Sequence, residues 1–348
     1  MPGILDEIQE QPDALHRTLD AVGPELASLA PFAEKLKQGA LRRVLFTGMG
    51  GSFHPATPPL MYLLEHGIDA DMMESSELLY HYRSLQNPRT LMVMVSQSGK
   101  SVEIVKLLEQ NGKHVPVIAI TNYPDSPLAL QSDAQLYIRA GVESTVSTKT
   151  NTCTVLVLHL LARVLSGEPL QPEIDKLRHV ADAVGKALPY WNKRAEELAA
   201  SLKDSRFLMF VGRGPSRASA MTAALIAKET TKLPTEGMVG GQFRHGPMEV
   251  LAPGVVIFLF APPGRTRGLD QSLAADLGKL NGQTIVVGTL DQPVSNVLSF
   301  DVSSEHLDEW TTPIIEIIPI QLFAARLAMA RGLEAGKFRY GQKVTTTE

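Results

Sequence analysis

The apolar residues of this 348-residue chain gather in two series of short runs, each followed by turn residues and then by a stretch with helical spacing. The first series covers residues 44–47, 91–95 and 115–121, and the second covers 207–211, 255–260 and 284–287. Runs that are apolar throughout are typical of strands buried on both faces of a parallel sheet. Their alternation with helices predicts an α/β fold with two doubly wound parallel sheets, each flanked by helices.

The segments outside these two series have the spacing of helices. Residues 4–37 carry apolar positions at helical spacing, interrupted at Gly23-Pro24 and Pro31, which predicts two or three short helices. The apolar stretch 314–327 fits a dimer surface and a buried core helix equally well. The predicted organisation is an N-terminal helical arm (1–40), a first domain (41–170), a helical linker (171–204), a second domain (205–335) and a C-terminal tail (336–348).

Both predicted sheets begin with a strand and a glycine turn, Gly48-Met49-Gly50 in the first and Gly212-Arg213-Gly214 in the second. A dinucleotide-binding turn needs a third glycine three residues further on, where this chain has Phe53 and Arg217. A nicotinamide or flavin cofactor is therefore disfavoured, and the chain is expected to need no cofactor.

The loop Ser96-Gln97-Ser98-Gly99-Lys100-Ser101 joins an apolar strand to a helix predicted over 102–110. Its hydroxyls and the unpaired N–H groups of the helix could cradle a phosphate group, although an ordinary polar turn with a serine cap remains an alternative. A nucleotide-binding P-loop would need a glycine at Met94. The second half has Ala261-Pro262-Pro263-Gly264 at the matching place, so we expect one phosphate site per chain, beyond the carboxyl ends of the strands.

Composition restricts the possible partners. The net charge of -4 and the pI near 6.2 offer no basic surface for nucleic acid or an anionic membrane. The single cysteine, Cys153, cannot form an intrachain disulfide, and the N-terminus lacks the features of a signal peptide, which indicates a cytoplasmic protein. No apolar run reaches the ~20 residues of a membrane helix. No His/Cys cluster has ligand spacing, so no metal is predicted.

A series of motifs in a fixed order covers nearly the whole chain: residues 7–12, Gly50-Gly51-Ser52, the serine loop, Ser147-Thr148-Lys149, Lys228-Glu229, His245-Gly246-Pro247, Ala330-Arg331-Gly332 and residues 343–348. Together they resemble the tandem sugar isomerase (SIS) domain family, and most closely the isomerase half of glucosamine-6-phosphate synthase. The resemblance implies that a sugar phosphate is the ligand. It also implies that Ser96, Ser98 and Ser101 bind the phosphate, with Gln97, Ser52 and Ser147 near the sugar.

The resemblance also implies three catalytic groups for moving hydrogen between C1 and C2 of a sugar. Glu229 would be the base, His245 would open the sugar ring, and Lys343 would form a Schiff base with a ketose carbonyl. From the residues alone, each has an alternative: a helix carboxylate beside Lys228, a turn histidine and a solvated tail lysine. In the family the histidine can come from the neighbouring subunit, which implies a homodimer with shared active sites.

Three positions depart from the synthase pattern. Ile226 stands where the family often has a lysine, Gly51 where it has a threonine, and Lys100 where the synthase usually has an acid. Met1 lies only a few residues before the motif that opens the isomerase half, so no glutamine-hydrolysing domain is expected. We therefore predict that the reaction removes an amine from an aminosugar 6-phosphate or a sugar-phosphate adduct, giving a ketose 6-phosphate.

Three alternatives to amine removal remain. The chain could be a simple aldose–ketose phosphosugar isomerase, in which Lys343 would be idle, or a synthase-like isomerase that uses free ammonia. It could also be a non-catalytic sugar-phosphate sensor, but such regulators usually add a DNA-binding segment, and the N-terminal arm has neither a helix-turn-helix pattern nor a basic face. Ammonia release would separate amine removal from simple isomerisation.

Overall fold

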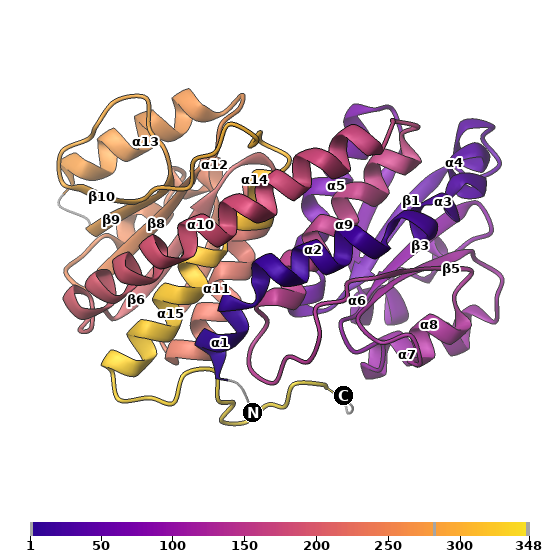
Figure 1. Cartoon of the computed structure of the whole chain (residues 1–348), viewed down its shortest axis with the longest axis horizontal. Helices are drawn as coiled ribbons and strands as arrows, with labels where there is room; N and C mark the ends of the chain where they lie inside the picture. The colour runs from indigo at the N-terminus through magenta and orange to yellow at the C-terminus, as the bar shows by residue number, and fades with distance from the viewer. Residues whose placement is uncertain (1–2, 281–282, 346–348) are drawn as a thin grey trace. The chain divides into compact units, whose positions relative to one another are not determined.

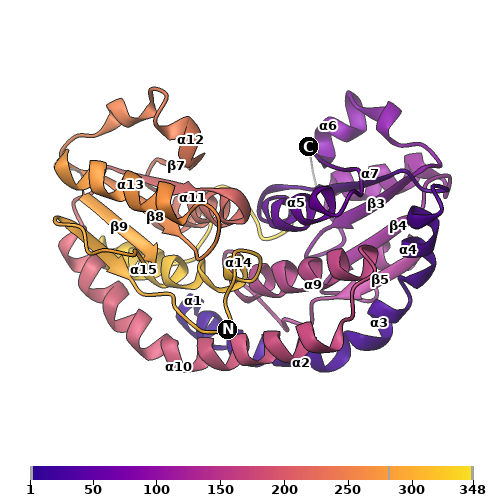
Figure 2. The ribbon, with the colours of Figure 1, turned by 90° about the horizontal axis from the view of Figure 1, so that it is seen from above.

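The computed structural model describes residues 3–280 and 283–345, and the chain divides into two compact units (Figure 1). The first-sheet unit comprises Asp13–Glu143, Lys149–Arg178 and Tyr340–Glu348. The second-sheet unit comprises Met1–Pro12, Ser144–Thr148 and His179–Arg339. Each unit contains one five-stranded parallel sheet with helices on both faces, as the apolar runs predict (Figure 2).

The first sheet has the strand order β2-β1-β3-β4-β5. Its strands are β1 (Arg43–Gly48), β2 (Ala70–Glu74), β3 (Thr90–Val95), β4 (Val117–Thr121) and β5 (Ala134–Tyr137). The accompanying helices are α2 (Gln11–Ala21), α3 (Gly23–Ala27), α4 (Ala30–Lys37), α5 (Thr57–Glu65), α6 (Ser75–Tyr80), α7 (Val102–Asn111), α8 (Pro127–Gln131) and α9 (Lys149–Leu165).

The second sheet repeats this topology in the order β10-β9-β8-β6-β7. Its strands are β6 (Phe207–Gly212), β7 (Thr235–Val239), β8 (Val255–Ala261), β9 (Gln283–Gly288) and β10 (Val297–Phe300). The accompanying helices are α1 (Ile4–Gln9), α10 (Gln171–Ser201), α11 (Arg217–Thr231), α12 (Gly240–Phe243), α13 (Arg267–Lys279), α14 (Thr312–Ile315) and α15 (Ile318–Ala330).

The central strands are buried on both faces, which explains why they read as continuous apolar runs. Every residue of β3 and β8 is buried. In the first sheet, Leu45, Met92 and Met94 pack on one face against leucines of α6 and α7. In the second sheet, Met209 and Ile257 pack in the same way against α13. The two cores are therefore built on the same plan.

The helical segments differ from their predicted boundaries in two places. The region 4–37 forms four helices, because Pro24 and Pro31 stand in the first turns of α3 and α4 and begin helices instead of interrupting them. The region predicted as a linker is one 31-residue helix, α10, that contains Pro189. Since the unit boundary falls within α10, between Arg178 and His179, this helix contributes to both units.

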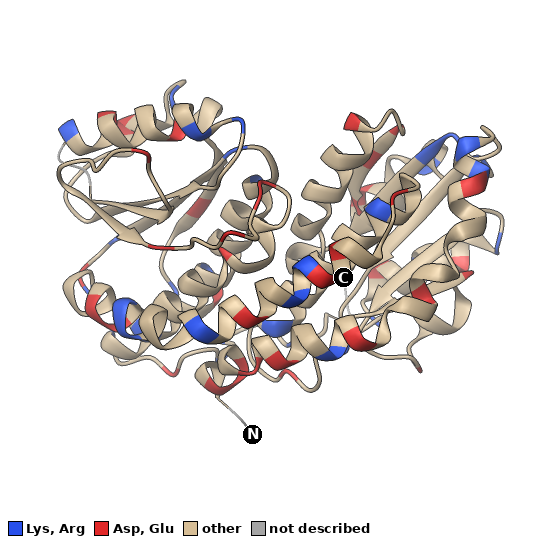
Figure 3. Cartoon of the chain, turned by 45° about the horizontal axis from the view of Figure 1, so that its top comes forward, with Lys and Arg blue, Asp and Glu red and all other residues tan. Residues whose placement is uncertain are grey.

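The apolar stretch around α14 and α15 forms a core helix pair. Thr312–Ala330 is the one segment among the described residues that is long and apolar enough to span a membrane, and 83% of its most apolar window is buried in the structure. Within the second-sheet unit, α15 packs on α11 and α1. Charged side chains of both signs are interleaved along the surface helices instead of being separated by sign (Figure 3).

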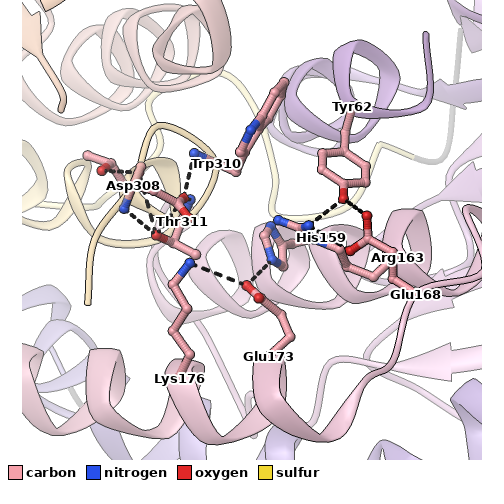
Figure 4. Close-up of polar contacts among 10 residues, drawn as sticks. Tyr62, His159, Arg163, Glu168, Glu173, Lys176, Asp308, Trp310 and Thr311 are labelled. Carbon is pink, nitrogen blue, oxygen red and sulfur yellow. Dashed lines mark hydrogen bonds and ion pairs between the residues drawn. The ribbon is translucent and has the colours of Figure 1, made fainter. Parts of the chain in front are cut away.

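A partly buried polar network lies at the C-terminal end of α9 in the first-sheet unit (Figure 4). Arg163 donates to Glu168 at 2.8 Å and to the Tyr62 hydroxyl, and its guanidinium lies 4.0 Å from the centre of the Tyr62 ring. His159 contacts Glu173 at 2.7 Å, which pairs one buried helix histidine with α10. Burial, followed by the hydrogen bond to Glu168, raises the pKa of Tyr62. The Tyr62 hydroxyl therefore keeps its proton.

Candidate active site

The serine loop and the Ser52 turn meet at the switch point of the first sheet. Strand order reverses between β1 and β3, and ligands of open α/β sheets bind at such a reversal, beyond the carboxyl ends of the strands. Gly48 ends β1, and a Cβ atom there would lie 2.9 Å from the carbonyl oxygens of both Ser52 and Val95. Only glycine permits this approach, which brings the turn after β1 against the end of β3.

Serine hydroxyls and backbone amides hold the serine loop in a tight turn. The Ser96 hydroxyl accepts from the Gly99 amide at 3.1 Å and lies 3.4 Å from the Ser101 hydroxyl. The Ser98 hydroxyl accepts from the Lys100 amide at 3.2 Å. Ser96 and Ser98 are themselves buried, so the three hydroxyls lie within one small, fixed turn.

Gly99 makes this turn possible because its φ is +62°, in the left-handed region. A Cβ atom at Gly99 would lie 2.2 Å from the Ser126 hydroxyl oxygen and 2.5 Å from Ser126 Cβ. The loop is also tied through Gln97, whose carbonyl accepts from the Asn122 amide at 3.1 Å. The backbone angle of Gly99 and the hydrogen bond between Gln97 and Asn122 together hold the serine loop in this conformation.

Ser101 stands at the N-cap of α7 with extended backbone, but its side chain makes no capping bond. Its hydroxyl therefore remains on the side of Ser96, next to the N–H groups and positive dipole of a ten-residue helix. Hydroxyl donors beside a helix N-terminus are the groups that bind phosphate in many proteins.

The C-terminal tail reaches the same helix end. The Val102 amide, the first of α7, donates to the Thr345 carbonyl at 3.3 Å. Two residues earlier, the Lys343 ammonium contacts a carboxylate oxygen of Glu143 at 2.5 Å. Within the first-sheet unit, the described part of the tail thus contacts both the first amide of α7 and Glu143. Residues 346–348 of the tail motif lie outside the described residues.

The Glu143 side chain is entirely buried at the start of α9. It accepts from the Thr150 amide at 3.0 Å and from the Thr150 hydroxyl at 2.6 Å. Burial would raise the pKa of Glu143, but the Lys343 charge and the bonds to Lys343 and Thr150 outweigh it, so its pKa lies below the ordinary value. The carboxylate is therefore charged and fixed.

The second-sheet unit carries the other three predicted residues. Glu229 is half-buried near the end of α11, and its carbonyl accepts from the Lys232 ammonium. His245 is exposed in the turn after α12, where its amide donates to the Gln242 carbonyl at 3.0 Å. Ser147 is half-buried in the segment Ser144–Thr148. Each unit therefore carries part of the predicted set.

The switch point of the second sheet, between β6 and β8, is filled by charged side chains of the protein itself. Arg213, in the turn after β6, pairs with the fully buried Asp270 at 3.3 Å. Arg265, after β8, pairs with Glu309, whose carboxylate packs so closely on Gly264 that a Cβ atom there would lie 2.7 Å from it. These ion pairs lie at the switch point of the second sheet, where the first sheet has the uncharged hydroxyls of the serine loop.

No group of three or more His, Cys, Asp or Glu side chains is arranged to hold a metal ion within residues 3–280 and 283–345. Cys153 is buried and makes no disulfide.

Two doubly wound sheets of the same topology, one with a serine cradle at its switch point, define an α/β protein of the duplicated, ligand-binding kind. The model of the SIS domain matches residues 40–163 and again residues 201–329. The chain belongs to the SIS domain family and contains two copies of the domain. The resemblance drawn from the short motifs is thereby confirmed.

Among curated relatives, the glutamine–fructose-6-phosphate aminotransferase (isomerizing) of Thermococcus kodakarensis is 32% identical over 359 residues, and that of Pyrobaculum aerophilum is 33% identical over 353 residues. Each alignment covers 99% of this chain but only 58% and 57% of the relative. The chain therefore spans somewhat more than half the length of these relatives and is homologous to their isomerase half.

Solved structures share the fold. The C-terminal domain of glucosamine-fructose-6-phosphate aminotransferase from Francisella tularensis superposes with a TM-score of 0.82 at 22% identity, covering 96% of this chain and 97% of that one. Tagatose-6-phosphate ketose/aldose isomerase from Escherichia coli gives 0.81 at 21% identity, covering 95% and 93%. Glucosamine-6-phosphate deaminase from Thermotoga maritima gives 0.71 at 20% identity, covering 95% and 99%.

Glu143 and Thr150 were not predicted as neighbours of Lys343 from the sequence. They lie on either side of the Ser147-Thr148-Lys149 motif, whereas Lys343 is 200 positions away from Glu143. The one local signal in the sequence is an acidic residue, Glu143, two residues after Gly141 and shortly before α9. This signal does not reveal the distant partner of Glu143.

Proposed function

We propose that this protein binds a sugar 6-phosphate and couples aldose–ketose isomerisation to loss of an amine, as an aminosugar-6-phosphate deaminase or a fructosamine-6-phosphate deglycase. The observation that carries the proposal is the course of the C-terminal tail: Thr345 contacts the first amide of α7, next to the serine loop, and Lys343, two residues earlier, pairs with Glu143. Simple isomerisation needs an acid and a base but no amine.

In this proposal the serine loop binds the phosphate. Hydroxyls of Ser96, Ser98 and Ser101 and amides of the first turn of α7 beyond that of Val102, which is bonded to Thr345, donate to its oxygens, since charge-assisted bonds of this kind are stronger than neutral ones. Gln97, Ser52 and Ser147 would contact the sugar. The phosphate anchors the substrate, and the remaining groups act on the other end of the open chain.

The catalytic roles follow the family pattern position by position. His245 would exchange a proton with the ring oxygen, and Glu229 would carry a proton between C1 and C2 through an enolamine. This shift turns the carbon that bears nitrogen into an imine. The Lys343 amine would attack that carbon and displace the substrate amine, which leaves the sugar as a Schiff base with Lys343, and water would then hydrolyse the Schiff base to a carbonyl and free Lys343. An amine on C2 leaves a ketose phosphate, and an amine on C1 leaves an aldose phosphate. We also propose a cytoplasmic homodimer in which His245 serves the partner's site.

The test is to incubate the purified protein with glucosamine 6-phosphate and with a fructosamine-type 6-phosphate, and to measure amine and sugar phosphate released together. Glu229→Gln and Lys343→Ala should each lower turnover at least 10²-fold, as loss of an acid–base or covalent group does. Lys337→Ala is the matched control, because Lys337 is exposed and its ammonium pairs with Glu334 on the surface.

Other outcomes would contradict the proposal in different ways. Ketose formed from a plain aldose phosphate, with no amine released from any substrate, would indicate an isomerase. Binding without turnover would indicate a sensor. Full activity in Lys343→Ala would remove the amine from the mechanism.

A further inference from the structure

A single carboxylate determines where the tail lysine lies. The Glu143 side chain is entirely buried, the Lys343 side chain is 23% exposed, and their charged atoms are 2.5 Å apart. Tail segments are ordinarily mobile, because few contacts hold them. An ion pair with one partner fully buried is a specific exception, since an unpaired carboxylate in that place would carry a large desolvation penalty.

Glu143 is itself rigidly held, so it can act as a fixed reference. The amide and the hydroxyl of Thr150 bind its two oxygens from the first turn of α9, a 17-residue helix whose N-terminal dipole favours an anion. With Thr150 on one side and Lys343 on the other, the carboxylate has no freedom to rotate. The position of the Lys343 amine is therefore determined by α9 and not by the tail.

The second contact of the tail fixes the direction in which the lysine is presented. The Thr345 carbonyl accepts from the Val102 amide at the end of the serine loop, so residues 343–345 run from Glu143 to the phosphate cradle. Both contacts lie within the first-sheet unit. A substrate phosphate in the cradle would thus lie next to Thr345, two residues along the tail from Lys343.

We propose that Glu143 is the positioning residue of Lys343 and the acceptor of its ammonium proton. This inference rests on the proposed function, in which Lys343 forms a Schiff base. An ammonium is not a nucleophile, so one proton must leave before attack. The lowered pKa of Glu143 opposes this transfer while Lys343 is in contact with water. A substrate that covers the exposed side of Lys343 would exclude water, and exclusion of water favours the neutral pair over the charged one.

The proton and atom balance closes with these two residues and water. Glu143 takes one proton from the ammonium, and the amine nitrogen forms a bond to the ketose carbonyl carbon. The carbonyl oxygen then leaves as water with the two remaining nitrogen protons. The proton on Glu143 returns to the nitrogen and gives the protonated imine, which regenerates the carboxylate.

Other ionisable groups near the pair must be considered in any pH experiment. A Cβ atom at Gly141 would lie 3.8 Å from the Arg17 guanidinium and 3.9 Å from the Lys149 ammonium, so two further cations lie near Glu143. Cys153 also feels the charge of Glu143, but burial raises the pKa of its thiol to about 12. None of these groups contacts Lys343 in a described bond, and all are unchanged in the variants below.

The experiment traps the Schiff base by borohydride reduction. The protein is mixed with fructose 6-phosphate, and modification of Lys343 is followed by peptide mass from pH 6 to 10. We expect Glu143→Gln to be trapped at least 10-fold more slowly than the parent at pH 7. The difference should shrink towards pH 10, where hydroxide removes the ammonium proton, and Glu143→Asp should recover part of the rate at pH 7.

Glu7→Gln is the matched control. Glu7 is also a fully buried carboxylate, bound to the Ser144 amide at 2.6 Å and to the Thr145 hydroxyl, but no lysine contact of it is described. Its pH profile should be parallel to that of the parent. A Glu143→Gln rate equal to or above the parent at pH 7, or a loss that is constant with pH, would overturn the proton-acceptor role.

A second readout needs no substrate. Trypsin cleaves after Lys343 only when the lysine leaves Glu143, so cleavage there should be several-fold faster in Glu143→Gln than in the parent or in Glu7→Gln. Unchanged cleavage would overturn the positioning role. If no ketose phosphate traps Lys343 in the parent protein, the Schiff base of the proposed function and the proton transfer both fail, and cleavage alone decides whether Glu143 positions the tail.

Discussion

The second-sheet unit contains a buried acid that should make the stability of the protein fall with rising pH. Glu316, between α14 and α15, is fully buried, and one of its oxygens accepts from the Ser219 hydroxyl at 2.6 Å. Burial raises the pKa of Glu316 to about 7, and the nearby Asp270 contributes in the same direction. In the unfolded chain the carboxyl returns to an ordinary value of 4.5.

The sign follows from which state holds the proton. Between pH 4.5 and 7 the folded protein keeps the Glu316 proton while the unfolded chain has lost it, so stability falls as pH rises. Each pKa unit corresponds to about 1.4 kcal/mol, so the whole shift is worth about 3 kcal/mol, most of which develops between pH 5 and 8.

Glu316→Gln removes this titration while keeping the acceptor for Ser219. Urea unfolding followed by tryptophan fluorescence is the suitable assay, because Trp191 and Trp310 both lie in the second-sheet unit with Glu316. The variant should lose about 2–3 kcal/mol less stability than the parent between pH 5 and 8. Ser219→Ala is a control of opposite sign, since the lost bond favours the charged acid and its removal should steepen the decline. Equal pH slopes in parent and Glu316→Gln would refute the reasoning.

Two other consequences can be measured directly. Gly99→Ala should destabilise the first-sheet unit by about 3 kcal/mol or more, because the alanine would add left-handed backbone strain and a clash with Ser126. Gly67, with φ of +74° and open space around it, is the control, and Gly67→Ala should cost only the strain, about 1–2 kcal/mol. Equal shifts in melting temperature would contradict the clash. Burial raises the pKa of the Cys153 thiol to about 12. A thiol reagent at pH 8 should therefore leave Cys153 unmodified in the native protein and react with it fully in urea. Rapid labelling of the native protein would show that Cys153 is accessible.

The interior strands could be predicted from the sequence because their environment imposes an unambiguous pattern. β1, β3, β8 and β9 have nearly every residue buried, and each was recognised as an apolar run. The four edge strands, β2, β5, β7 and β10, were missed because none has two consecutive buried residues. At a sheet edge, composition no longer distinguishes a strand from a loop.

The candidate site shows the same division between local and distant information. The serine loop could be predicted because six consecutive residues carry both its hydroxyls and its glycine. The pairing of Lys343 with Glu143 joins positions 200 residues apart, and it depends on the burial of an acid that looks like any polar loop residue in the sequence. Contacts between distant residues of this kind need the fold.

The duplication allows the two switch points to be compared directly, and they differ in charge. Both switch points place a helix N-terminus and a glycine turn side by side, so both began with the geometry that attracts an anion. At the second, Arg213 and Asp270 neutralise one another at 3.3 Å, and Glu309 lies against Gly264 where the backbone would have to approach a ligand. A phosphate there would have to displace carboxylates of its own charge. Neutral hydroxyls at Ser96, Ser98 and Ser101 impose no such repulsion, and this difference of charge, within one shared topology, is why the proposed phosphate site belongs to the first sheet and not to the second.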